Sequence, residues 1–232
     1  MYHFAVFSII SISTLLALES SNDSNAPNKL YQTLNTNGGW SLLNEDGDIS
    51  IFTKIINDHN ISAVMVSQNI SIPLDLIQNV IMDVNNYSSI LSNAGNMITK
   101  AVEIKDSIVI AYQFIPINIP FVDDRHYYFK LKKNKISSEK ESLLVNWHLI
   151  DKGILKNDFE NLEALYISYG AGIWKAKKDN FGKVKLTYRI FMDPNGSMPN
   201  FIIDKINEIS IINLFKDVIK ESEKRFIKRI GE

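Results

Sequence analysis

The stretch from Thr187 to Ile206 constrains the fold of this chain more than any other, because two sequence patterns meet there at a sharp boundary. An alternating, strand-like run ends at Asp193-Pro194-Asn195-Gly196, whose residue types are typical of a tight turn. Ser197 and Pro199 follow, and they suit the N-cap and the first turn of a helix. Apolar residues then recur at helical spacing towards the C-terminus: Ile202, Ile206, Ile209, Phe215, Val218, Ile219 and Phe226. We therefore predict a final strand, a corner and one long C-terminal helix.

Much of the remaining chain reads as strands. Strand-like runs occupy residues 97–104, 107–114, 123–133, 143–150, 167–174 and 183–192. Upstream, the segment 45–48 predicts a hairpin turn between two more strands, and 61–70 predicts another. Helical spacing begins at Pro73, and a short helix is expected at 28–37. This order predicts a single α+β domain, in which an antiparallel sheet carries helices on one face.

Side chains alternate along the predicted strands, so each strand has an apolar (dry) face expected to be buried and a polar (wet) face expected to meet solvent. One inward face is expected to carry Arg125, Tyr127, Phe129 and Leu131, which leaves His126 on the wet face. The same reasoning groups Ile108, Ile110, Tyr112 and Phe114 in another strand, and Val184, Leu186, Tyr188 and Ile190 in the last. Because one long helix must cover this broad dry surface, two outcomes stay open, a solid core or an internal cavity.

Three segments resemble a known family and occur in the family's order. They are GGWSLLNEDGDISIFTK at 38–54, PINIPFVDDRHYYF at 116–129 and YGAGIWKAKKDNFGKVKLTYRIFMDPNGSMPNFIID at 169–204. In these segments the chain is similar to StAR-related lipid transfer (START) domains, within the Bet v 1-like helix-grip superfamily. Asn195 stands where the family commonly has Gly, and Asn tolerates the left-handed backbone of such a turn. A characteristic Trp after the first helix is absent, and Tyr87 lies in its region.

The resemblance implies a helix-grip fold at 38–232, in which a curved antiparallel β-sheet wraps around the long C-terminal helix and encloses an apolar cavity. It also implies that the chain binds a single hydrophobic ligand, a sterol, phospholipid or related lipid, without a cofactor. Such a protein would act as a monomer that transfers or presents the lipid in transient contact with a membrane. Because a fold does not fix a function, two alternatives stay open: a cyclase or hydrolase, and a module that binds a partner protein.

The candidate ligand-binding residues come from the dry strand faces and the helical stripe: Arg125, Tyr112, Phe114, Tyr127, Phe129, Trp147, Tyr188, Ile202, Ile206 and Ile209. Arg125 has two interpretations, because a buried guanidinium needs partners. It is either the anchor for a ligand headgroup or half of a structural ion pair with Glu103 or Asp123.

Signatures of other functions are missing from the sequence. The four histidines show no metal-binding spacing, and no nucleophile elbow or cofactor motif occurs. The enzyme alternative therefore predicts an inward cluster of titratable groups, for instance His148 near Tyr188 or Asp106. The chain has no cysteine, which excludes disulfides and thiolate metal sites. Its net charge of −1 provides no basic field for nucleic acid, so none is expected as a partner.

The N-terminus has its own pattern. The run from Phe4 to Leu18 is apolar and uncharged, and it is shorter than the ~20 residues that span a bilayer. It suits the central region of a secretory signal peptide. We expect a signal peptide at 1–20, an extension with a short helix at 21–37, and export to the periplasm or the medium. An uncleaved membrane anchor is the alternative.

Overall fold

The computed structural model describes residues 25–56, 59, 61–92, 94–117, 119–134, 142–152, 163–178, 183–196 and 200–231, with only the backbone described at 25–28 and 200–209. The predicted signal peptide at 1–20, Ser197 and Pro199 therefore lie outside the described residues. The elements are α1 (Asn25–Asn35), β1 (Ser41–Asp46), β2 (Ile49–Ile55), β3 (Ser62–Ile70), α2 (Leu74–Met82), a 3-10 turn (Val84–Asn86), α3 (Tyr87–Ile90), β4 (Ile98–Lys105), β5 (Ile108–Ile115), β6 (Arg125–Lys133), β7 (Ser142–Ile150), β8 (Leu165–Tyr166), β9 (Gly170–Lys178), β10 (Val184–Met192) and α4 (Asn200–Gly231).

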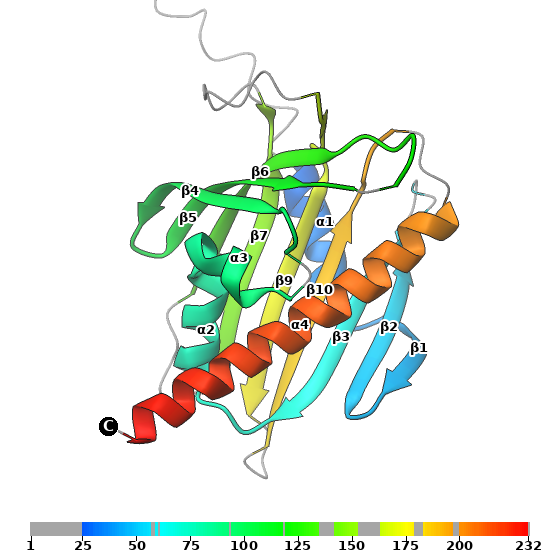
Figure 1. Ribbon diagram of the computed structural model, residues 1–232. Coiled ribbons are helices and arrows are strands. Elements are labelled where there is room, and N and C mark those ends of the chain that lie inside the picture. The colour runs from blue at the N-terminus through cyan, green and yellow to red at the C-terminus, as the bar shows by residue number, and fades with distance from the viewer. Residues whose placement is uncertain are drawn as a thin grey trace, which may run out of the picture.

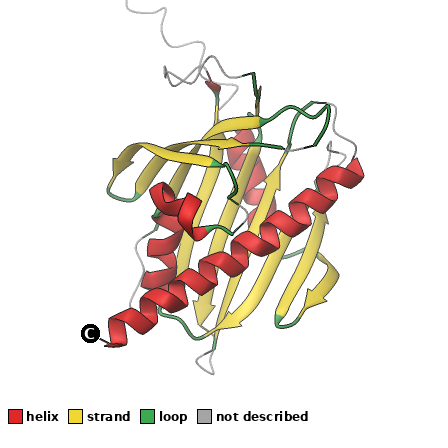
Figure 2. Cartoon of the chain, viewed as in Figure 1, coloured by secondary structure: helices red, strands yellow, loops and turns green. Residues whose placement is uncertain are grey.

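The strands form one curved sheet in the order β1-β2-β3-β10-β9-β7-β6-β5-β4, and neighbouring strands on this path are antiparallel. The short strand β8 pairs with β6 in parallel. Helix α4 crosses one face of the sheet, and α2 and α3 lie on the same side (Figures 1 and 2). Helix α1 packs on the opposite face, against β9 and β10. The predicted α+β class and the sheet gripping one long helix are confirmed.

The main core lies between the inner sheet face and the helices. Phe215 of α4 is fully buried, and its ring stacks on Trp174 of β9 with centroids 5.8 Å apart. Trp174 stacks in turn on Tyr188 of β10 at 4.1 Å. These three parallel rings fix the position of α4 over the centre of the sheet, because burying large aromatic side chains contributes strongly to stability.

Helix α1 is held on the outer face by cations around its C-terminal end. Arg189 of β10 donates to the main-chain carbonyls of Leu34 and Asn35 at 2.8 and 3.0 Å. Lys54 of β2 donates to the carbonyl of Thr33 at 2.9 Å. Lys175 of β9 reaches the side chain of Asn35. Positive side chains are favourable at this end of a helix, where the carbonyls lack partners, so the N-terminal extension docks on the sheet.

Two expectations about strand faces are wrong. Tyr112 and Phe114 were predicted to face inward, but β5 pairs Tyr112 with Tyr128 and Phe114 with His126 of β6, which places them on the outer face. His126 was predicted to be wet, yet only 3% of it is exposed. The physical reason is that β8 adds Tyr166 to this side, and its ring lies edge-on to His126 at 5.2 Å. A small outer cluster therefore buries residues that alternation alone assigns to solvent.

Candidate functional site

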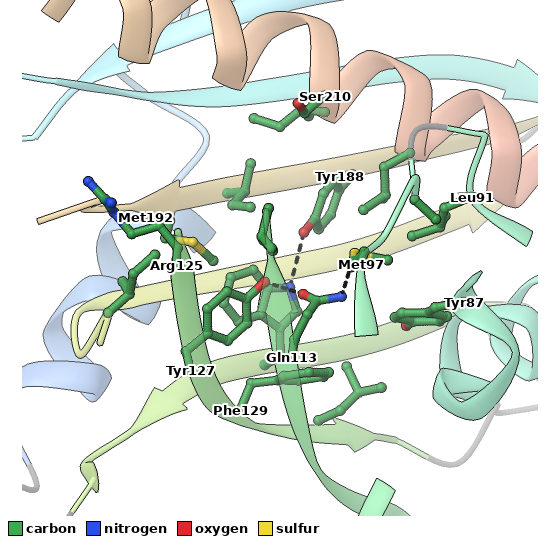
Figure 3. Close-up of a pocket in the computed structure, with 18 of the residues that line it drawn as sticks. Tyr87, Leu91, Met97, Gln113, Arg125, Tyr127, Phe129, Tyr188, Met192 and Ser210 are labelled. Atoms are coloured by element: carbon green, nitrogen blue, oxygen red, sulfur yellow. Dashed lines mark hydrogen bonds between the residues drawn. The ribbon is translucent and has the colours of Figure 1, made fainter. Parts of the chain in front are cut away.

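A cavity of about 270 Å³ lies between the inner sheet face and α4. Its lining is mostly apolar, and it is contributed by α2, α3, the segment before β4, the strands and α4 (Figure 3). The walls include Ile81, Leu91, Ile115, Leu131, Ile167, Ile190, Ile211, Leu214 and Val218. Of the two packing outcomes that the sequence leaves open, the structure therefore has the cavity.

The structure brings half of the predicted site residues together at this cavity. Those that line it are Arg125, Tyr127, Phe129, Trp147 and Tyr188. Tyr112 and Phe114 do not, because they lie on the outer face of β5. Ile202, Ile206 and Ile209 belong to α4, but their side chains lie outside the described part of the chain. The described residues of α4 that line the cavity are Ser210, Ile211, Leu214, Asp217 and Val218, of which only Val218 belongs to the predicted apolar stripe.

Arg125 holds the corner that follows β10. Its Nε donates to the carbonyl of Pro194 at 2.7 Å and its Nη2 to that of Asn195 at 3.1 Å. Its Nη1 donates to the carbonyls of Asp123 and Asp124. Burial lowers the pKa of Arg125, and the nearby carboxylates of Asp123 and Asp124 act against this. Among the described residues its hydrogen-bond acceptors are all main-chain carbonyls, and it forms no ion pair with Glu103 or Asp123.

The corner that Arg125 holds is built from residues that can adopt its backbone. Asn195 has φ 55° and Gly196 has φ 77°, the left-handed region that Asn and Gly tolerate best. The Asp193 carboxylate accepts a hydrogen bond from the Asn195 N–H at 2.9 Å. A side chain at Gly196 would meet Leu165 at 3.0 Å. The turn predicted from the sequence is thus held by Arg125 on one side and by Asp193 on the other.

One pair of polar groups lies on the β5–β6 side of the cavity. The Tyr127 hydroxyl donates to Oε1 of Gln113, and the Gln113 amide donates to Oγ1 of Thr99 at 2.9 Å. Sequence reasoning missed Gln113, because bulky apolar residues flank it and hide the period of β5. The pairing of Gln113 with Tyr127 across the β5–β6 hairpin is the signal that could have found it.

A second polar pair lies across β7 and β10. The indole N–H of Trp147 donates to the Tyr188 hydroxyl at 3.1 Å. Burial raises the pKa of Tyr188, and it raises that of Tyr127 too, with a contribution from the neighbouring Tyr188. Both hydroxyls therefore stay protonated and uncharged. Figure 3 shows Tyr127, Gln113 and Tyr188 converging in the middle of the cavity.

Gly172 makes room for the Trp147 indole. It pairs with Trp147 across β7 and β9, and an added Cβ would lie 2.4 Å from the indole nitrogen. We expect Gly172→Ala to push the indole away from Tyr188 and to lower the free energy of unfolding by about 1–3 kcal/mol, as overpacking does. Urea unfolding and tryptophan fluorescence measure both effects. Gly38→Ala, where nothing lies within 4 Å of the added Cβ, is the matched control and should change neither.

The segment before β4 is fastened over the cavity by one carboxylate of α4. Asp217 accepts hydrogen bonds from both the main-chain N–H and the hydroxyl of Ser92, at 2.7 and 2.8 Å. Leu91 and Met97, on either side of Ser92, line the cavity. Hydrogen bonds to a charged partner are stronger than neutral ones, so this contact holds the segment against α4.

Removing that contact should loosen the segment without unfolding the protein. We expect Asp217→Ala to raise the amide exchange rates of Ser92, Ala94 and Met97 by about tenfold or more, because each charge-assisted hydrogen bond contributes roughly 1.5–3 kcal/mol. Hydrogen exchange followed by mass spectrometry measures this. Ser89→Ala removes an exposed hydroxyl bonded to Asn86 and should leave the rates unchanged. Unchanged exchange in Asp217→Ala would show that other contacts hold the segment.

The structure does not form the example that the enzyme alternative gave, in which His148 lies near Tyr188 or Asp106 inside the cavity. His148 follows Trp147 on β7 and therefore points to the opposite face from the cavity, where it pairs with Lys130. Asp106 lies in the turn between β4 and β5 with φ 41°. Among the described residues, no group of three His, Asp or Glu side chains could hold a metal ion. The titratable groups that do line the cavity are those of Tyr87, Arg125, Tyr127, Tyr188 and Asp217.

Comparison with known proteins finds similarity of structure but no match in sequence. No protein-family model and no curated protein sequence matches the chain. Its structure is similar to a STAR-related lipid transfer protein fragment from Xanthomonas axonopodis, with a TM-score of 0.66 and 14% identity over 80% of this chain and 99% of the fragment. It is also similar to human STARD10, with a TM-score of 0.67 and 12% identity over 91% of this chain and 84% of that protein.

Human StAR-related lipid transfer protein 5 is a third structural neighbour, with a TM-score of 0.67 and 10% identity over 88% of this chain and 95% of that protein. The similarity covers between 84% and 99% of each of these three structures. The order of the elements, the curved sheet and the long final helix agree with this structural similarity. The chain therefore has the helix-grip fold of the START domains.

Proposed function

We propose that this protein binds one hydrophobic small molecule in the cavity beneath α4 and transfers or presents it to a membrane. The observation that carries the proposal is the apolar cavity of about 270 Å³ between the sheet and the helix. A well-formed apolar pocket with a few convergent polar groups is the usual form of a small-molecule site. A module with a solid core would have no such space. The START-like fold supports the same proposal.

The binding experiment uses the full chain and the neutral dye Nile red. We expect saturable Nile red fluorescence at one site per molecule, and a hydrophobic compound in organic extracts of the purified protein. Native mass spectrometry of the same sample should show the protein with one bound mass. A protein that carries no extractable compound and does not bind Nile red would contradict the proposal.

Transfer is a separate step and needs its own measurement. We expect the protein to speed the movement of a fluorescent lipid analogue from donor to acceptor vesicles in proportion to protein concentration. Among the helices that the structure describes, none combines the length and apolar character needed to cross a bilayer. Binding without any transfer would leave storage or presentation as the role.

We also propose that the chain is exported, on the basis of the apolar run from Phe4 to Leu18. N-terminal sequencing of the protein recovered from its native cell envelope or medium tests this. A mature N-terminus close to residue 20 is the expected result. A full-length chain held in the membrane fraction would instead show the N-terminal anchor.

A further inference from the structure

The polar groups inside the cavity define the ligand more closely than the apolar lining does. The hydroxyls of Tyr127 and Tyr188 and the Gln113 amide converge inside the cavity (Figure 3), and the Trp147 indole donates to the Tyr188 hydroxyl. Tyr127 and Tyr188 are only 5% and 3% exposed. Because buried polar groups are nearly always hydrogen-bonded, each donor and acceptor here can be accounted for.

Among these four polar groups, one donor hydrogen and one acceptor oxygen have no hydrogen-bond partner in the described part of the chain. The Tyr127 hydroxyl uses its hydrogen on Gln113, whose amide uses its own on Thr99 and on a methionine sulfur. The Trp147 N–H is used on the Tyr188 oxygen. Among the described residues, the hydrogen of the Tyr188 hydroxyl has no acceptor and the Tyr127 oxygen has no donor. A ligand group placed between them would accept from Tyr188 and donate to Tyr127.

The described groups around the gap between Tyr188 and Tyr127 carry no charge: they are two phenols, the Gln113 amide and the Trp147 indole. The guanidinium of Arg125 is used on the carbonyls of Pro194, Asn195, Asp123 and Asp124. The carboxylate of Asp217 is used on Ser92. An ionised ligand group between the two tyrosines would therefore lose its water and gain only uncharged partners, which is unfavourable. The ligand must be uncharged where it meets the polar groups.

The volume of the cavity limits the ligand as well. Pockets for drug-sized molecules usually measure about 300–1,000 Å³. The cavity of about 270 Å³ is just below this range, so it suits a compact molecule with one chain or one fused ring system. A lipid with two acyl chains and a phosphate headgroup would exceed it in size and would also be charged.

We infer that the ligand is a compact, uncharged alcohol whose hydroxyl lies between Tyr188 and Tyr127. A hydroxyl fits because it is both a donor and an acceptor, whereas an ether or ketone only accepts. This inference rests on the proposed function and names the ligand class of the same cavity. It assigns Tyr188 the role of donor to the ligand oxygen and Tyr127 that of acceptor from the ligand hydroxyl.

The test compares ligands that differ only at the polar group. Bound Nile red is displaced with 1-hexadecanol, its methyl ether and palmitate, and in parallel with cholesterol, its methyl ether and its sulfate. We expect at least one of the two alcohols to displace the dye about tenfold more tightly than its ether and its charged counterpart, since a buried hydrogen bond contributes about one kcal/mol or slightly more. Phosphatidylcholine should displace it least.

A substitution at Tyr188 then tests the assigned contact. In Tyr188→Phe the preference for the alcohol over its ether should fall to about onefold to twofold, measured by competition against the Nile red affinity determined for the same variant. Tyr112→Phe is the matched control, since that tyrosine lies on the outer face and its hydroxyl is near His126. The control should keep the full preference.

The outcomes separate this inference from the proposed function. If Nile red binds but an ether, an acid or phosphatidylcholine competes as well as the alcohols, the ligand class is wrong and the cavity still binds hydrophobic molecules. The same conclusion follows if neither alcohol competes, or if Tyr188→Phe keeps the preference. If Nile red itself does not bind to the full chain, the proposed function fails first.

Discussion

Replacing Arg125 with Met is expected to lower the free energy of unfolding by about 2–4 kcal/mol, because several buried carbonyls lose their donor and each unsatisfied group costs roughly 1–3 kcal/mol. The side chain is 4% exposed and donates to carbonyls on both sides of the corner. Met keeps much of the apolar length but leaves these buried carbonyls without donors. The corner at Pro194 and Asn195 would then lose its tie to β6. Urea unfolding followed by circular dichroism measures the change.

This experiment also separates the two interpretations of Arg125 that the sequence leaves open. A headgroup anchor would lose ligand affinity with little change in stability, whereas the structure predicts a large loss of stability. Arg229→Met is the matched control, because Arg229 is exposed on α4 and pairs with the exposed Asp75. Exposed ion pairs contribute about 0–1 kcal/mol, so the control should change little. Equal effects in both variants would contradict the structural role of Arg125.

The sequence predicts the order of the elements well because local chemistry determines it. The hairpin between β1 and β2, the corner at 193–196 and the long helix α4 follow from turn residues and from helical spacing, which act over a few residues. The short strand β8 and the helix α3 were not predicted. Both are too short to show a period, and β8 exists only because β6 supplies its partner.

It is harder to predict which face of a strand points inward, since that depends on packing between segments that are distant in the sequence. In β6 all four predicted inward residues line the cavity, and in β10 Tyr188 and Ile190 do. In β5 both faces are apolar, so alternation carries no information, and Tyr112 and Phe114 were placed on the wrong side. The predicted start of β9 at Ile167 is also wrong, because the strand begins at Gly170.

The candidate site could be predicted only in its apolar part. Aromatic residues on β6, β7 and β10 are found by composition and alternation. The hydrogen bonds of Gln113 and of Asp217 join segments that are 14 and 125 residues apart in the chain, and no local pattern shows them. The use of Arg125 on main-chain carbonyls is equally hidden, because carbonyls are present at every residue. The hydrogen bonds between these polar groups are therefore seen only in the structure.

Replacing Phe215 with Ala should destabilise the protein by about 3–5 kcal/mol, because a large, fully buried side chain leaves an unfilled space when it is removed. Its ring is parallel to that of Trp174 within 2°, and Trp174 stacks on Tyr188 beside the cavity. Loss of Phe215 therefore removes the contact that presses α4 onto the stacked rings. We expect a lower midpoint in urea unfolding and a red-shifted tryptophan emission as Trp174 becomes hydrated.

The same helix provides the control. Phe226 is half-buried near the C-terminal end of α4, so Phe226→Ala changes helix propensity equally but should cost only about 1 kcal/mol for its smaller buried area. Equal effects of the two substitutions would mean that α4 is not fixed at Phe215. A large loss confined to Phe215→Ala would show that the aromatic stack of β9, β10 and α4 holds the helix in place. Since α4 is also a wall of the cavity, the stability of this stack and the closure of the binding site then depend on the same residue.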